Sequence, residues 1–233
     1  MLFTPTWIES FRLVTAPPLA RVVVGVDPAA SSGSDSAETG IVVAGIDAQT
    51  PPHAYVLHDA SLRGTPDRWA RAALHALEHW DASRLIVETN QGGDMAIHTL
   101  RTLNPSAPIK RAHAARGKVL RAEPIAALYE QGRVHHVGML ATLETQMVGW
   151  MPGMPSPDRL DALVWALSDL LLTGKGAAGG APRGACAPLA ARGGRVSSWG
   201  ETGGSAVRKD RSMGPKTGFG GGRFRGGRAH WAP

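Results

Sequence analysis

The chain has 233 residues, 43% of them hydrophobic, which is enough for one substantial core or for a domain with a tail. Its single cysteine, Cys186, excludes a disulfide framework and a cysteine-type zinc site and suits a reducing compartment, and no apolar run approaches the roughly 18–20 residues of a membrane span. The net charge of +6 is unevenly divided, because residues 174–233 hold 11 basic and 2 acidic side chains, a balance of +9, which leaves −3 for residues 1–173.

The basic C-terminal segment is also rich in glycine, as in GKGAAGGAPRGA and GFGGGRFRGGRAH. Such a composition cannot bury enough apolar surface to offset the entropy of ordering, so we expect residues 174–233 to form a disordered tail. Arginine with occasional aromatic residues (Phe219, Phe224 and Trp231) can bind nucleic acid by charge and stacking. A tail that only improves solubility is an equal alternative.

The predicted elements begin after a connector segment, residues 1–20. Runs of β-branched residues and a turn at 49–52 predict a meander of three strands, at 21–27, 39–47 and 53–61. Helices and short strands then alternate. Helices are predicted at 65–80, 92–103, 117–131, 140–150 and 158–172, and extended segments at 83–90, 107–113 and 134–137. This order predicts an α/β fold, a mixed sheet flanked by helices on both sides, over residues 21–173.

Acidic residues stand where the chain changes direction. Asp27 and Glu88 each end an apolar strand, and in an open α/β sheet the carboxyl ends of the strands face the ligand crevice. Asp158 and Asp161 lie in the first turn of the last predicted helix, three residues apart and so close to one face. If the strands are neighbours, these carboxylates converge.

Converging carboxylates repel one another unless a cation neutralises them. Oxygen ligands suit Mg²⁺ or Mn²⁺, and two such ions about 3.5–4 Å apart form the arrangement that cuts phosphodiesters. Each acid alone has a simpler interpretation, since an aspartate before proline often forms a turn and one in a first helical turn often caps the helix. The order of strand-end Asp, strand-end Glu and helix-start Asp is more specific than any one of them.

That pattern resembles the RNase H-like nuclease superfamily and, within it, the C-terminal nuclease domain of the large terminase subunit of phages or gene transfer agents. The resemblance covers roughly residues 5–172. It implies a metal-dependent endonuclease that cleaves double-stranded DNA during viral genome packaging, with two Mg²⁺ or Mn²⁺ ions and products ending in a 3′-hydroxyl and a 5′-phosphate. The segments that carry it are VVVGVDPA (22–29), TGIVVAG (39–45), LIVETNQGGD (85–94), KVLRAEPIAALYEQGRVHH (118–136) and SPDRLDALVWAL (156–167).

By motif position, the resemblance implies that Asp27, Glu88 and Asp161 are the catalytic metal ligands, with Asp158 as a companion. Some terminases use a further acid in the loop after the first strand, for which Asp35, with Glu38 behind it, is the nearest candidate.

DNA contacts are expected from two segments. Asn90 follows Glu88 at a glycine-containing turn, and a basic run spans a strand, a loop and a helix start: Lys110, Arg111, Arg116, Lys118 and Arg121. The simpler interpretation of such a run is a solvated face. Tryptophans at helical positions, Trp165 among them, are expected in the core.

The chain has no G-x-x-x-x-G-K-[ST] motif, so we expect no ATPase activity from it. The resemblance implies a terminase ATPase domain, a small terminase subunit and a portal protein as partners. It places the protein in the host cytoplasm and transiently at the procapsid portal, and we expect the isolated domain to be a monomer that binds no membrane. Two alternatives stay open, a Holliday-junction resolvase-like nuclease and a non-catalytic DNA-binding or docking module.

Overall fold

The computed structural model describes residues 2–28, 38–90, 93–113 and 117–173. All of them belong to one compact unit, Met1–Pro188. The predicted tail at 174–233, and with it the tail's proposed DNA binding, lies outside the described residues.

A seven-stranded mixed sheet forms the centre of this unit, with the strand order β6-β5-β1-β2-β3-β7 and β4 paired to β2. The first three strands are an antiparallel meander, whereas β5 is parallel to β1, β6 to β5, and β7 to β3. The strands are β1 Arg21–Asp27, β2 Glu38–Ile46, β3 Ala54–Asp59, β4 Leu62–Arg63, β5 Leu85–Glu88, β6 Ile109–Ala112 and β7 Val134–His136.

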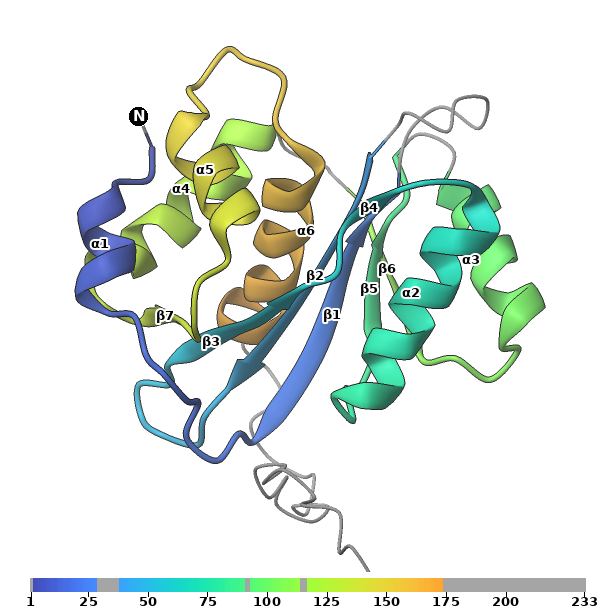
Figure 1. Ribbon diagram of the computed structural model, residues 1–233, viewed down its shortest axis with the longest axis horizontal. Helices are drawn as coiled ribbons and strands as arrows, with labels where there is room; N and C mark the ends of the chain where they lie inside the picture. Colours follow the sequence, from blue (N-terminus) through green and yellow to red (C-terminus); the bar gives the residue numbers. More distant parts are fainter. Residues whose placement is uncertain (1, 29–37, 91–92, 114–116, 174–233) are drawn as a thin grey trace, which may run out of the picture. The chain divides into compact units, whose positions relative to one another are not determined.

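Helices cover both faces of the sheet. Figure 1 shows α2 and α3 on one side and α1, α4, α5 and α6 on the other. The helices are α1 Pro5–Ser10, α2 Pro66–His79, α3 Gly93–Leu103, α4 Lys118–Glu130, α5 Ala141–Gly149 and α6 Asp158–Leu167, which continues into a π-helical turn, η1 Ser168–Leu172. None of the helices in the described part of the chain has both the length and the apolar character needed to span a bilayer.

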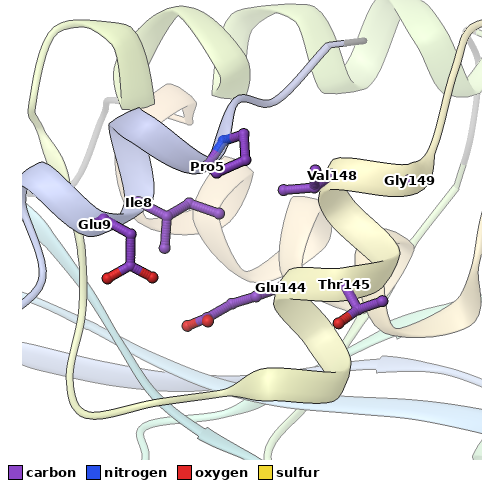
Figure 2. Close-up of a pocket in the computed structure, with 7 residues that line it drawn as sticks. All are labelled: Pro5, Ile8, Glu9, Glu144, Thr145, Val148 and Gly149. Atoms are coloured by element: carbon purple, nitrogen blue, oxygen red, sulfur yellow. The ribbon is translucent and has the colours of Figure 1, made fainter.

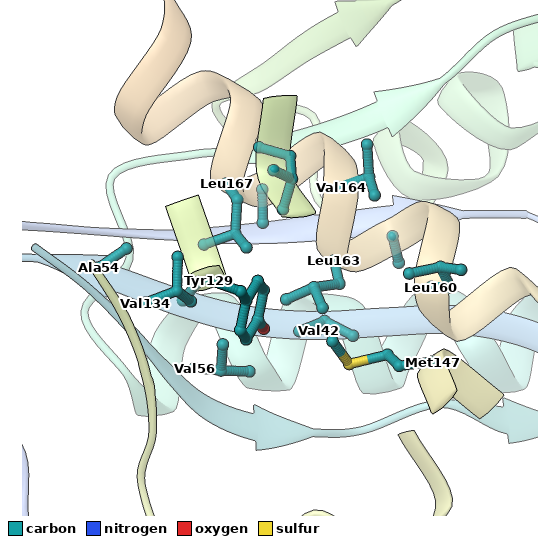
Figure 3. Close-up of a cluster of buried hydrophobic side chains, with 14 of the residues drawn as sticks. Val42, Ala54, Val56, Tyr129, Val134, Met147, Leu160, Leu163, Val164 and Leu167 are labelled. Atoms are coloured by element: carbon teal, nitrogen blue, oxygen red, sulfur yellow. The ribbon is translucent and has the colours of Figure 1, made fainter. Parts of the chain in front are cut away.

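The sheet separates two hydrophobic cores, because its central strands are apolar on both faces. Val24 and Val26 of β1 pack toward α2 and α3, and Val23 packs toward α6. Figure 3 shows the second core, where Leu160, Leu163 and other α6 side chains meet β2, β3 and α4. Alternating faces of one buried strand therefore hold both helical layers in place.

Helix α6 lies unusually close to the strands beneath it because glycines face it. A Cβ atom at Gly25 would stand 3.0 Å from the carbonyl carbon of Ala162, and one at Gly40 would stand 2.9 Å from the backbone nitrogen of Arg159. A glycine within a strand often marks such a backbone approach. The two glycines thus set the height of α6 above β1 and β2.

The predicted α/β class, with a mixed sheet and helices on both faces, is confirmed. Three details differ from the prediction. A short helix, α1, forms within the predicted connector, the third strand ends at Asp59 before the separate β4, and the last helix turns π-helical at Ser168. Helix α1 has only six residues and buries only Ile8, which leaves no periodic signal to read.

Candidate active site

Four predicted acids lie at one end of the sheet. Asp27 and Glu88 are the last residues of β1 and β5, which are parallel neighbours with Val26 opposite Val87. The two strands therefore end side by side. Asp158 and Asp161 lie in the first turn of α6, which begins at the same end (Figure 1). Asp27 and Glu88 are each only 8% exposed and Asp161 is 3% exposed. The fold therefore brings together acids that are far apart in sequence.

The electrostatics of these carboxylates show their proximity. Burial, followed by repulsion from Glu88, Asp161 and Asp158, raises the pKa of Asp27 well above the ordinary range of an aspartate, against the opposing charge of Lys118. Burial and the charge of Glu38 raise the pKa of Asp158 to about 6. The raised pKa values of Asp27 and Asp158 thus reflect burial together with neighbouring negative charge.

One ammonium group enters the cluster from α4. Lys118 Nζ forms an ion pair with Asp161 Oδ2, and Ser156 Oγ donates a hydrogen bond to the same oxygen. Partial burial acts to lower the pKa of Lys118, but the hydrogen bond and charge of Asp161, with the charges of Asp27 and Glu88, raise it overall. The Lys118 side chain is 46% exposed, so the ammonium lies between the carboxylates and solvent.

Glu88 is held by donors on both carboxylate oxygens. Asn90 Nδ2 donates to Oε1 over 2.7 Å, and the indole Nε1 of Trp165 donates to Oε2 over 2.7 Å. Arg121 Nη1 lies 3.9 Å from Oε2, and the guanidinium carbon of Arg121 lies 4.4 Å from the centroid of the Trp165 ring. The orientation of Glu88 is thus fixed by side chains from α4, α6 and the loop after β5.

The donor set of this site suits a hard divalent cation, because it consists of carboxylate oxygens that crowd a nearly buried Asp27. In the described residues, no group of three or more His, Cys, Asp or Glu side chains is arranged to hold a metal ion as placed. As placed, the Asp161 carboxylate is engaged by Lys118 and Ser156. A cation shared with Asp27 and Glu88 requires the ion pair between Asp161 and Lys118 to open.

The residues predicted to contact DNA are spread over different surroundings. Lys110 Nζ lies 2.6 Å from Asp169 Oδ1, and Arg111 Nη1 lies 2.5 Å from Asp94 Oδ1, so both are engaged in ion pairs. Lys118 lies at the carboxylates, Asn90 beside Glu88, and the side chain of Arg121 is only 10% exposed. Arg116 and the candidate acid Asp35 lie outside the described residues.

Three residues of the site were not predicted in their present roles. Trp165, expected in the core, binds Glu88; its position four residues after Asp161, on the same helical face, is the signal that could have indicated it. Ser156 has no pattern that predicts its bond to Asp161. Glu38, considered only behind Asp35, lies close enough to Asp158 to raise its pKa and is paired with Arg159.

A groove of about 430 Å³ lies elsewhere, between α1 and α5. Figure 2 shows its lining, Pro5, Ile8, Glu9, Glu144, Thr145, Val148 and Gly149. None of the predicted site residues lines it. Glu144 is instead bound to Arg12 and to the buried His136, which ties the chain before β1 to α5. The groove is therefore separate from the carboxylate site.

A protein-family model described as the Terminase RNaseH-like domain matches residues 24–170, a range that contains all four acids. No curated protein matches the chain.

Solved structures of low identity share the fold. The large terminase of a thermophilic bacteriophage is 12% identical with a TM-score of 0.52, over 69% of this chain and 42% of that one. The large terminase nuclease of the thermophilic phage G20c, in a structure with bound zinc, is 15% identical with a TM-score of 0.50, over 72% of this chain and 97% of that one. RuvC of Thermus thermophilus is 16% identical with a TM-score of 0.43, over 65% and 95% of the two chains. The family model and the two terminase structures support an RNase H-like architecture.

Proposed function

Because the chain belongs to the terminase RNase H-like domain family, we propose that it is a metal-dependent endonuclease that cleaves double-stranded DNA during viral genome packaging. The observation that carries the proposal is the convergence of Asp27, Glu88, Asp158 and Asp161 at one end of the sheet. Nearly buried carboxylates that repel one another destabilise the fold unless a cation compensates them. Their convergence favours a site for cations.

Asp27, Glu88 and Asp161 are the proposed ligands, with Asp158 as a companion. When bound, two Mg²⁺ or Mn²⁺ ions would supply an activated water and stabilise the leaving oxygen of the phosphodiester. The structure of the G20c nuclease with bound zinc supports a divalent ion at a site of this fold. The strand ends of β1 and β5 hold two of the ligands rigidly, and α6 holds the others.

Lys118 has a second part in the proposal. Its ammonium neutralises Asp161 from the solvent side, and its flexible side chain is long enough to turn outward to a DNA phosphate. Asn90, exposed beside Glu88, adds a neutral donor at the same edge. Contacts of this kind go to the phosphate backbone, so cleavage should show little sequence preference.

The partners follow from the family. We propose that the nuclease acts together with a terminase ATPase domain, a small terminase subunit and a portal protein, in the host cytoplasm and at the procapsid portal. We also propose that Lys110, Arg111 and Arg116 contact DNA phosphates, whereas Arg121, whose side chain is only 10% exposed, acts on Glu88 instead. The isolated domain is expected to be a monomer.

The test is plasmid cleavage by the purified chain with Mg²⁺, Mn²⁺, Ca²⁺ or EDTA, beside the variants Asp27→Asn and Asp67→Asn. Asp67 is the matched control, an exposed aspartate of α2 that forms an ion pair with Arg71. We expect cleavage with Mg²⁺ or Mn²⁺, none in EDTA, a loss of at least about 100-fold in Asp27→Asn, and full activity in Asp67→Asn.

Three results would contradict the proposal. Cleavage that is unchanged in Asp27→Asn would remove the carboxylates from the chemistry. DNA binding without cleavage under any ion, and without Mn²⁺ binding by calorimetry, would indicate a non-catalytic module. A strong preference for four-way junctions over linear duplex would instead indicate a resolvase-like nuclease.

A further inference from the structure

Arg121 is an unusual residue in the described part of the chain. Its side chain is only 10% exposed, and its Nε and Nη1 atoms are buried with no hydrogen-bond partner among the described residues. Buried charged donors without partners are costly, and native proteins rarely keep them without a reason. The two groups nearest to this guanidinium, Trp165 and Glu88, supply the reason.

The Arg121 guanidinium rests on the Trp165 ring, 4.4 Å from its centroid, a cation–π contact that is stronger where water is excluded. The same guanidinium lies 3.9 Å from Glu88 Oε2, too far for a hydrogen bond but close enough for strong attraction. Arg121 therefore holds the indole from one side and places a positive charge beside Glu88.

Trp165 connects two of the acid-bearing elements. It lies four residues after Asp161 on α6, and its Nε1 donates to Glu88 Oε2 at the end of β5 over 2.7 Å. One rigid helix thus carries the carboxylate of Asp161 and the donor that orients the carboxylate of Glu88. This hydrogen bond therefore fixes the Glu88 carboxylate relative to the Asp161 carboxylate.

Asn90 completes the arrangement at the other oxygen of Glu88, which it holds over 2.7 Å. A carboxylate has about four lone-pair sites on its two oxygens, so one donor on each oxygen leaves others available for a cation. The plane of the Glu88 carboxylate is then set before any ion arrives. In other proteins, hydrogen bonds from neighbouring side chains orient metal ligands in this way, and their loss lowers metal affinity by about 10–100-fold.

We propose that Trp165 is a positioning residue that, with Arg121 stacked on its ring, fixes the carboxylate of Glu88 for a divalent cation. The inference rests on the proposed function, since it concerns the same site. It assigns a role to the indole N–H of the half-buried Trp165, beyond the packing of its ring against the core, and it accounts for the burial of the Arg121 guanidinium.

The test is Mn²⁺ binding to the full chain, measured by calorimetry for wild type, Trp165→Phe and Trp80→Phe. Phenylalanine keeps an aromatic ring under Arg121 and removes the indole N–H. Trp80 is the matched control, a partly buried tryptophan at the end of α2 that lies near His58 and His79. We expect Mn²⁺ affinity to fall about 10–100-fold in Trp165→Phe and to stay unchanged in Trp80→Phe.

Three further readouts separate positioning from folding. Mn²⁺ should quench a part of the tryptophan fluorescence that Trp165→Phe lacks and Trp80→Phe keeps. Plasmid cleavage by Trp165→Phe should recover much of its rate when Mn²⁺ is raised above the new dissociation constant. Thermal unfolding in EDTA, followed by circular dichroism, shows whether the variant is folded.

Wild-type Mn²⁺ affinity in a folded Trp165→Phe protein would overturn the inference and leave the proposed function intact. If Trp165→Phe does not fold, Arg121→Lys takes its place, because lysine keeps the charge and loses the planar stack; unchanged Mn²⁺ affinity there would overturn the inference as well. Absence of both Mn²⁺ binding and cleavage in the wild type would overturn the proposed function, and the inference with it.

Discussion

Replacing Gly25 by alanine should move helix α6 and weaken the site without touching a carboxylate. The added methyl group would stand 3.0 Å from the carbonyl carbon of Ala162, closer still to its oxygen, and 3.1 Å from the Cβ of Ala166. Non-bonded carbon atoms in van der Waals contact are normally about 3.5–4.0 Å apart. Because the obstructing atoms belong to the helix backbone, no side-chain rotation relieves the contact, and α6 must shift by roughly 0.5–1 Å.

The size of the effect follows from two consequences of that shift. Overpacking of a core costs about 1–3 kcal/mol, which lowers the Tm of a domain of this size by about 2–12 °C. Asp161, next to Ala162, moves with the helix, and a displacement of about 1 Å in an active site can reduce the rate about 100-fold. The loss of activity should therefore exceed the loss of folded protein at 25 °C.

The assay combines thermal unfolding in EDTA with plasmid cleavage at saturating Mn²⁺. Gly149→Ala is the matched control, since a Cβ at Gly149, in α5, would meet nothing within 4 Å. That variant should keep the wild-type rate and a Tm that is unchanged or slightly higher. A Gly25→Ala protein with wild-type Tm and cleavage rate would refute the reasoning, because α6 would then not rest on β1 at the height described.

Two further predictions concern other parts of the chain. Although burial acts to raise the pKa of Glu144, hydrogen bonds from His136 and Arg12 lower it from 4.5 to about 2. The resulting stabilisation is complete above about pH 4.5 and is lost as the pH falls toward 2, so over this range the free energy of unfolding in urea should fall by up to about 3 kcal/mol more in the wild type than in Glu144→Gln. Parallel pH profiles of the two proteins would contradict this. Removal of residues 174–233, with their balance of +9, should leave cleavage intact and weaken DNA binding at low salt in a filter-binding assay, and loss of all cleavage would contradict it.

The sequence was sufficient to place the acids on their elements. An apolar run that ends in an acid is a local pattern, and both β1 and β5 end where the pattern predicts, at Asp27 and Glu88. That the two strands are neighbours was assumed and not predicted, because strand order depends on how the helices cross between strands. The parallel pairing of β1 with β5 satisfies that condition.

The partners of the acids could not be predicted, because they depend on contacts between elements far apart in the chain. A basic run in sequence does not reveal which of its members turn inward; Arg121 is nearly buried against Trp165, whereas Arg111 is exposed and paired with Asp94. In the same way, the glycine of VVVGVD indicates a close approach without naming α6 as the neighbour.

The contacts around the acids make α6 the element on which the site geometry depends most. It carries Asp158, Asp161 and Trp165, and its height above the sheet is set at Gly25. A change that tilts or lifts this helix displaces two carboxylates and also the indole that orients Glu88. A change confined to β5 displaces Glu88 alone, so substitutions at the interface between α6 and the sheet should be more damaging to metal binding than equally destabilising substitutions beneath α2 or α3.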